Sequence, residues 1–158
     1  MGRLDRIIEG LSNFESNIEG IVMDEIMDHS EELEEMNRDQ MLEGIDSYGN
    51  PIRPKYSEDP FFKTAEAARK YAEWKMRISP RTGRDIDTPN LFINGFYHSG
   101  IKARLADKKI YTSNTSNFGM EVTSTFSTAE GIAPDNIAIL AEKYVAPKII
   151  QELKNILK

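Results

Sequence analysis

The sequence contains no cysteine, one tryptophan and two histidines among its 158 residues. Without cysteine the chain can form neither a disulfide nor a thiolate metal site, and this absence is compatible with a reducing compartment. No apolar run approaches the roughly 20 residues that a membrane-spanning helix needs, and residues 1–10 lack the apolar core of a signal peptide. We therefore expect a soluble protein, used inside a cell, with no membrane partner.

Charge is unevenly distributed along the chain, whose formal net charge is −6. Residues 1–50 hold 14 acidic and 3 basic side chains, whereas residues 51–158 hold 12 acidic and 17 basic ones. Such asymmetry is typical of proteins that contact something charged, either nucleic acid or the oppositely charged part of a neighbouring subunit. A solvated acidic helix beside an ordinary basic surface is the alternative that needs no partner.

Apolar residues recur at spacings of three and four from Leu4 to Met36, which is the pattern of an amphipathic helix. We predict a long acidic helical segment over residues 1–43. We expect an interruption near Gly10 or Gly20, because glycine weakens a helix by about 1 kcal/mol. The apolar stripe drifts around the helix and does not favour a long coiled coil. A helix of this length exceeds what one small domain can cover, so part of it is expected to pack on a neighbouring subunit.

A loop over residues 40–56 separates this helix from the rest of the chain. Gly44 and Gly49 can adopt positive φ at low cost, and Asp46 can hydrogen-bond its own backbone in a turn. Pro51 forbids helix and favours extended chain. These four residues are predicted to set the shape of the loop. Three apolar side chains are expected to anchor it, namely Tyr48, Ile52 and Tyr56.

Two helices are predicted after the loop from their starting signals. In Asp59-Pro60 the aspartate is a plausible N-cap and the proline a suitable first helical residue, so we predict a helix from there to about Ile78. Thr88-Pro89 repeats this arrangement, and apolar residues as far as Leu105 would belong to the second helix.

Residues 109–113 and 120–126 alternate in polarity and are rich in β-branched and aromatic residues, which predicts an antiparallel strand pair. Helical periodicity returns from Asp135, and Pro147 is expected to start or kink the final helix. Residues 44–158 are therefore predicted to form one domain. The predicted fold class is α+β and helix-dominated, with a long N-terminal helix, a small antiparallel β-sheet packed by helices, and a C-terminal helix.

Catalytic signals are weak, and we do not predict an enzyme. His29 falls on the apolar stripe of the first helix and is expected to be a half-buried packing or interface residue rather than a ligand. His98 lies beside Ser99, and a Ser-His-Asp triad with Asp85 or Asp87 can be drawn. The sequence context of a nucleophile elbow is absent around that serine, so this triad is not favoured.

Metal and cofactor signals are equally weak. Residues 46–50 resemble a calcium-binding loop only in part, because the glycine is not at the sixth position and Glu58 comes one residue late. We read this segment as a turn. The sequence contains no HExxH, P-loop or GxGxxG motif, so no metal and no cofactor is expected. The many carboxylates leave a small carboxylate-dependent hydrolase open, but nothing places two of them around a cleft.

Charged residues on either side of the loop are the candidate contact residues. Cations and aromatic residues are interleaved over residues 61–84, which would suit contact with phosphate backbones, although a solvated face over an aromatic core gives the same pattern. Lys75 belongs to this basic stretch. The residues expected to contact other subunits, partner proteins or DNA are Glu31, Glu32, Glu34, Glu35, Lys63, Arg69, Lys70, Arg77, Arg81 and Arg84.

Two segments carry a resemblance to a known family. Residues 43–52, EGIDSYGNPI, followed by Tyr56-Ser57, resemble the phrase G-x-D-x-x-G-x-x-(W/I) of the virion-morphogenesis and tail-completion (neck) proteins of tailed bacteriophages. Residues 90–101 are similar to that family's L-x-x-(T/S)-G-x-(L/F)-x-x-S-(I/M) helix, with Asn94 before the glycine and an additional Gly100. The similarity covers roughly residues 38–127 and leaves out the acidic helix.

The resemblance implies a structural virion protein with a small sheet and flanking helices, forming a hexameric or dodecameric ring at the head–tail junction or the top of a tail. Its partners would be further copies of itself, the portal or other neck and tail proteins, and packaged DNA. It would be made in the host cytoplasm and located in the virion. Gly44, Asp46 and Gly49 would fix the loop. The residues that would anchor loop to helix are Tyr48, Ile52, Tyr56, Phe96 and Tyr97.

A nucleic-acid-binding protein that uses the basic helix over residues 61–84 is the alternative function. Contact with an acidic protein surface would use the same cations.

Overall fold

Two N-terminal helices, α1 (Arg3–Asp28) and α2 (Ser30–Leu42), form an almost continuous rod. The computed structural model describes residues 2–116 and 119–158. The rod breaks at His29, whose φ and ψ are −109° and 28°. The predicted break at Gly10 or Gly20 was therefore wrong in position, and both glycines lie within α1.

The C-terminal residues form a second rod, which consists of α6 (Pro134–Leu140), a π-helical turn η1 (Ala141–Val145) and α7 (Ala146–Leu157). Pro147 lies in the first turn of α7, as expected for a residue that starts a helix. The preceding π turn is wider than an α turn, and it accommodates the missing N–H and the bulk of the proline ring.

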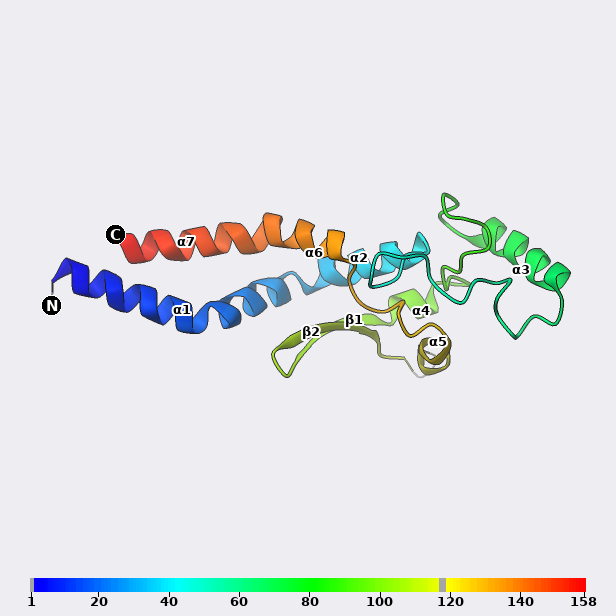
Figure 1. Ribbon diagram of the computed structural model, residues 1–158, viewed down its shortest axis with the longest axis horizontal. Coiled ribbons are helices and arrows are strands. Elements are labelled where there is room, and N and C mark those ends of the chain that lie inside the picture. The colour runs from blue at the N-terminus through cyan, green and yellow to red at the C-terminus, as the bar shows by residue number, and fades with distance from the viewer. Residues whose placement is uncertain (1, 117–118) are drawn as a thin grey trace.

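The two rods lie side by side and antiparallel, so that both chain ends meet at one tip of an elongated molecule (Figure 1). We call the pair of α1 and α7 the stalk. Gly10 allows close approach within it, because a Cβ at this position would lie 2.8 Å from Cγ2 of Ile156. Every residue of both stalk helices retains some solvent exposure.

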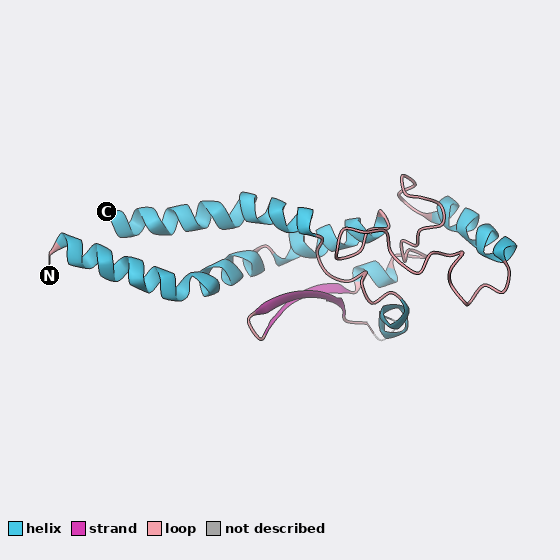
Figure 2. Ribbon diagram, viewed as in Figure 1, coloured by secondary structure: helices cyan, strands magenta, loops and turns pink. Residues whose placement is uncertain are grey.

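The sheet is a single hairpin of β1 (Ile101–Ala106) and β2 (Lys109–Asn114), drawn in magenta in Figure 2. Residues 109–113 form a strand as predicted, but their partner is β1 and not residues 120–126. The two-residue turn Asp107-Lys108, with positive φ at both positions, pairs β2 with the segment directly before it. The predicted helix through Leu105 was wrong for this reason.

Residues predicted as the second strand belong instead to helix α5 (Gly119–Thr125). Val122 and Phe126 are four residues apart, and both pack against the central hydrophobic cluster, which consists of Met41, Ile52, Tyr97, Ile101 and Ala129. Helical spacing of these two apolar residues thus outweighs the β-propensity of the threonines between them. The α+β class, with a helix-dominated composition, was confirmed.

Helix α3 (Ala65–Ile78) begins later than predicted. Its N-cap is Thr64, whose Oγ1 accepts a hydrogen bond from the N–H of Ala67 at 3.1 Å. Asp59 caps an isolated turn instead, where its carboxylate accepts from the N–H of Phe61 at 2.9 Å. The earlier start at Asp59-Pro60 was therefore wrong, whereas the end at Ile78 was confirmed.

Residues 89–95 form a loop rather than the start of a helix, and only α4 (Phe96–Ser99) follows it. The buried Asn90 explains the difference. Its Nδ2 donates to Oγ of Ser79 at 2.7 Å, and its Oδ1 accepts from the N–H of Phe92 at 3.2 Å. Such side-chain bonds hold the backbone in a non-helical path.

The loop over residues 40–56 has the predicted conformation. Gly44 and Gly49 have φ of +75° and +81°. Oδ1 of Asp46 accepts from the N–H groups of Tyr48 at 3.0 Å and Asn50 at 2.9 Å. Pro51 forms an isolated bridge with Ile45.

Three of the expected anchors are buried, namely Ile52, Tyr56 and Tyr97. Tyr48 and Phe96 are 70% and 71% exposed, so they do not anchor the loop. Ile52 and Tyr97 belong to the central hydrophobic cluster with Met41, Ile101 and Ala129, while Tyr56 belongs to a second cluster beside α3.

The two loop glycines should respond differently to substitution by alanine. At Gly49 the added Cβ would be 3.9 Å from its nearest neighbour, so positive φ alone should lower the free energy of unfolding by about 1 kcal/mol. At Gly44 the Cβ would also lie 2.8 Å from Cγ2 of Thr88, so we expect the free energy of unfolding to fall by about 3 kcal/mol. Urea unfolding of G44A and G49A measures both. Equal losses would show that the space around Gly44 is not limiting.

Candidate assembly surface

The stalk carries a row of large apolar side chains that stay exposed among the residues that the structure describes. On α1 their exposed fractions are 69% for Leu4, 58% for Ile8, 40% for Leu11 and 38% for Ile18. On α7 Ile150 and Leu157 are 50% and 53% exposed. We call these six residues the stalk flank. They are spaced by three, four or seven residues on each helix, so each set forms one stripe.

The two stripes lie on the same side of the stalk. Ile8 follows the half-buried Ile7 by one residue, and Ile150 follows the half-buried Ile149 by one residue, which is a rotation of about 100° in each case. Because the two helices run in opposite directions, a step of one residue turns clockwise on one helix and counter-clockwise on the other when both are viewed along the stalk. Both side chains therefore turn from the line of contact toward the same side of the stalk. Each helix therefore has an apolar face wider than its partner covers.

The stalk flank ends where the β-hairpin begins to cover α1. Further along α1, Val22 and Ile26 are half-buried, and they line a cavity of about 440 Å³ with residues of β2 and α6. Lys108, at the hairpin turn, forms an ion pair with Glu19 at 3.5 Å. The hairpin thus covers the apolar stripe beyond Glu19, whereas the apolar side chains before Glu19 are exposed.

Two of the four glutamates predicted as contact residues bond within the chain. Glu32 accepts from Nζ of Lys143 at 2.8 Å and from the hydroxyl of Tyr144, so it ties α2 to η1. These hydrogen bonds lower the pKa of Glu32. His29 stacks on Tyr144 with ring centroids 3.5 Å apart, in agreement with its predicted packing role. Glu31 and Glu35 point into solvent.

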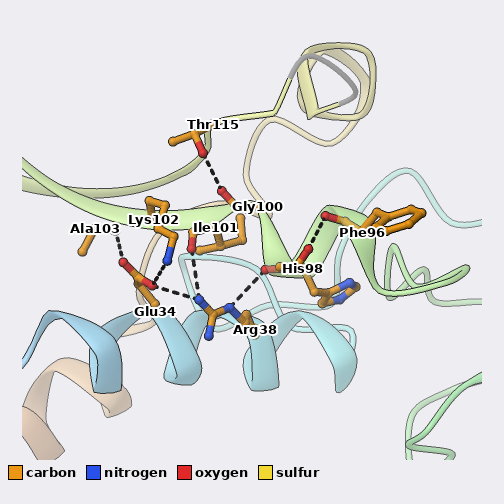
Figure 3. A network of polar contacts seen from close by, with 10 residues as sticks. Glu34, Arg38, Phe96, His98, Gly100, Ile101, Lys102, Ala103 and Thr115 are labelled. Carbon is orange, nitrogen blue, oxygen red and sulfur yellow. Dashed lines mark hydrogen bonds and ion pairs between the residues drawn. The ribbon is translucent and has the colours of Figure 1, made fainter.

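Glu34 is buried and joins α2 to β1 (Figure 3). Its Oε1 accepts from the N–H of Ala103 at 3.0 Å, and its Oε2 accepts from Nζ of Lys102 at 3.0 Å and Nη2 of Arg38 at 2.9 Å. Arg38 also donates to the carbonyls of His98 and Ile101, at 3.1 and 3.2 Å. Burial acts to raise the pKa of Glu34, but these bonds and charges outweigh it and lower the pKa.

Four of the six predicted cations are exposed on or next to α3, namely Lys63, Arg69, Lys70 and Arg77. Two of the four are balanced by acids on the same helix, since Lys70 pairs with Glu66 at 2.7 Å and Arg69 with Glu73 at 3.8 Å.

The other two cations turn inward. Arg81 pairs with Asp39 at 2.8 Å and Glu43 at 2.6 Å, which joins the end of α3 to α2. Arg84 donates to the carbonyl of Thr88 at 2.9 Å.

Lys75 is buried, with 2% of its surface exposed, although the sequence placed it in the basic stretch. Its Nζ donates to the carbonyl of Phe92. Burial, with the nearby charge of Arg84, lowers the pKa of Lys75 to about 8. Its spacing from Ala72 and Ala68, three and seven residues along α3, is a signal that could have placed it on the inner face.

The structure places the members of the possible Ser-His-Asp triad in separate contacts. Burial lowers the pKa of His98 to about 4, which keeps the imidazole neutral at pH 7. Oγ of Ser99 donates to the carbonyl of Phe96 at 3.0 Å, Asp85 pairs with Lys55 at 3.0 Å, and Asp87 accepts from Ser57. The structure therefore does not connect these groups as a triad.

Within residues 2–116 and 119–158, no three His, Asp or Glu side chains are grouped so that they would hold a metal ion. None of the helices in the described part of the chain combines the length and apolar character that crossing a membrane requires.

Comparison with protein-family models, with curated proteins and with solved structures found no match to this chain.

The structural role of Glu34 can be tested against its exposed neighbour. Glu34→Gln removes the charge that Lys102 and Arg38 pair with, so the free energy of unfolding at pH 7 should fall by about 2 kcal/mol. Glu35→Gln should change it by less than about 0.5 kcal/mol. The contribution of Glu34 is present above the pKa of the unfolded carboxyl, and it should vanish as pH falls through the lower folded pKa. Equal unfolding energies for the two variants at pH 7 would contradict this role.

Lys75→Met should stabilise the protein. The folded pKa of about 8 lies below the ordinary value of 10.5, so burial of the charged amine is unfavourable at pH 7. We expect a gain of about 2 kcal/mol in the free energy of unfolding. The gain should shrink as pH rises from 8 to 10.5, because the wild type then loses its buried charge. Lys70→Met, on the exposed face of α3, is the control and should show neither effect. A loss of stability in K75M at pH 7 would refute this account.

Proposed function

We propose that the chain is a structural assembly protein, specifically a component of a ring at the head–tail junction or tail top of a tailed bacteriophage. The observation that carries the proposal is the stalk flank. Apolar residues scattered singly on a surface are common, but a monomer rarely gathers six large ones along one side of two adjacent helices. Burying a Leu or Ile side chain fully contributes about 1.5–3 kcal/mol. The six half-exposed side chains therefore represent on the order of 5 kcal/mol that a neighbouring subunit can recover.

Charge complementarity favours a second copy of the chain as that neighbour. Glu15 lies between Leu11 and Ile18 on α1, at spacings of four and three residues, and Lys154 lies between Ile150 and Leu157 on α7 at the same spacings. One stripe of the flank thus holds an acid and the other a base. A copy placed with its α7 against α1 would match apolar to apolar and Glu15 to Lys154.

The register of the stalk makes this pairing feasible. Within the chain Gly10 lies against Ile156, so Glu15 is level with residue 151 on the antiparallel α7. In a ring whose axis runs parallel to the stalk, the α7 of the next copy lies at the same level. Lys154 is three residues from that level, which is about 4.5 Å along the helix axis. The long side chains of Glu and Lys span such an offset. A contact of α1 with the α7 of the next copy can repeat around a closed ring.

The phage assignment rests on the sequence resemblance over residues 38–127, and the conformation of the loop is compatible with it. The positive φ at Gly44 and Gly49 is what that glycine–aspartate turn would require. Besides further copies of the chain, its neighbours in the virion would be the portal or other neck and tail proteins. Locating the chain by electron microscopy at the portal–tail boundary of purified virions would support the assignment, and its absence from virions would overturn it.

Contact of the α3 cations with DNA is the second candidate. Lys63 and Arg77 are exposed, and α3 lies at the end of the molecule opposite the stalk tip (Figure 1). A strictly monomeric chain whose DNA affinity falls steeply with salt would favour this function over ring assembly.

Light scattering after size exclusion tests the stalk flank directly. We expect the wild type to form oligomers of the size of a ring as its concentration rises. Ile8→Gln combined with Ile150→Gln should weaken association by about 50-fold, because two apolar side chains leave each contact. The control combines Ile86→Gln with Ile93→Gln, at positions that are 43% and 52% exposed outside the stalk. This control should assemble normally.

Charge reversal adds a test of the proposed neighbour. Glu15→Lys should weaken association, and so should Lys154→Glu, whereas the double reversal should restore it because the pair is re-formed in the opposite sense. A wild type that stays monomeric at every concentration, or equal assembly by both Ile→Gln pairs, would refute the stalk as the assembly surface.

A further inference from the structure

A cavity of about 320 Å³ lies between the two hydrophobic clusters, at the end of the molecule far from the stalk. Its walls come from α3, from the loops before and after that helix, and from α4 and α5 with the residue that follows α5. The walls are mostly aromatic and aliphatic. Six aromatic side chains line the cavity, namely Tyr56, Phe61, Phe62, Tyr71, Tyr97 and Phe126.

Lys75 is a buried cation in this wall. Its Nζ donates to one acceptor, the carbonyl of Phe92, and an ammonium group can donate three hydrogen bonds. The other charged residue of the wall is Asp59, which is partly exposed and whose carboxylate accepts from the N–H of Phe61 at 2.9 Å. The ion pairs found among the described residues do not include Lys75. A buried cation without a carboxylate is unfavourable unless an anion reaches it.

We propose that this cavity binds a small amphipathic anion, whose apolar body lies against the aromatic wall and whose carboxylate or sulfonate head accepts a hydrogen bond from Lys75. Ligand sites of this kind combine mostly apolar walls with a few convergent polar groups. The aromatic and aliphatic walls and the buried ammonium of Lys75 meet both requirements, and the volume of about 320 Å³ suits a small ligand. The site is separate from the stalk and does not depend on ring assembly.

The pKa of Lys75 supports the same conclusion. At about 8 it leaves the amine mainly protonated at pH 7, so the charge is present to attract an anion. A bound anion would favour the charged form and raise this pKa. Binding should therefore weaken as pH rises above 8 and the amine loses its proton. Tyr56 and Tyr97, which also line the cavity, stay neutral in this range because burial raises the pKa of both.

Two fluorescent probes with related aromatic bodies test the proposal in the full-length chain. 1-Anilinonaphthalene-8-sulfonate carries an anionic head, whereas N-phenyl-1-naphthylamine has the same ring system without a charge. The single tryptophan, Trp74, is on α3, with its ring 5.4 Å from that of the cavity residue Tyr71. Energy transfer from Trp74 therefore reports probe in this cavity and not on the distant stalk flank (Figure 1).

We expect the wild type to bind the sulfonate about tenfold more tightly than the uncharged probe, which is the effect of one charge-assisted hydrogen bond. Lys75→Met should abolish this preference while the uncharged probe still binds. Lys70→Met removes the same charge from the exposed face of α3 and should behave as wild type. Decanoate should displace the sulfonate at lower concentration than decanol does.

The proposal would be overturned by any of three results. One is equal affinity of the wild type for the charged and uncharged probes. Another is unchanged affinity of K75M for the sulfonate, and the third is fluorescence enhancement without energy transfer from Trp74. Because K75M is expected to be more stable than the wild type, a loss of sulfonate binding in this variant is not a consequence of unfolding.

Discussion

The rest of the structure depends on the pairing of α1 and α7, two amphipathic helices that have mainly each other for cover. Each carries an apolar face wider than one neighbouring helix can shield, and every residue in both keeps some exposure. Close packing is confined to the line of contact, where Gly10 admits Ile156. A stalk of this kind gains stability when another helix covers the remaining stripe. Incomplete burial is thus the physical basis on which we propose an assembly role.

Internal ion pairs hold the stalk in a fixed relation to the body and so define which charges remain for partners. Glu34 ties α2 to the β-hairpin, and Glu32 ties α2 to η1 at the base of the stalk. The cations at the far end are partly neutralised in the same way, since Arg81 pairs with Asp39 and Glu43. Among the described residues, ion pairs join five acids of the N-terminal segment to bases further along the chain, namely Glu19, Glu32, Glu34, Asp39 and Glu43. Glu15 on α1 and Lys154 on α7, which lie between residues of the stalk flank, are the charges that we propose to pair between copies.

Helical periodicity and turn chemistry predicted much of the fold. The long N-terminal helix, the conformation of the loop at Gly44 and Gly49, and the final helix all follow from local signals. The hairpin partner did not, because a two-residue turn at Asp107-Lys108 carries no glycine or asparagine to announce it. In the sequence, Lys75 and Glu34 are indistinguishable from surface charges. Composition alone does not reveal that the carbonyl of Phe92 will accept from a buried Lys75, or that the N–H of Ala103 will donate to a buried Glu34. The sequence indicated only that the N-terminal helix is too long for one small domain to cover, and did not identify the residues of the stalk flank.

Hydrogen exchange, followed by mass spectrometry at increasing protein concentration, tests the central claim most directly. Amides of a partnered helix open less often than those of an exposed one. If copies associate through the stalk flank, exchange over residues 4–18 and 149–157 should slow as concentration rises, while exchange in α3 stays constant. Unchanged exchange in the stalk under conditions where the chain forms oligomers would contradict the claim, because assembly would then use another surface.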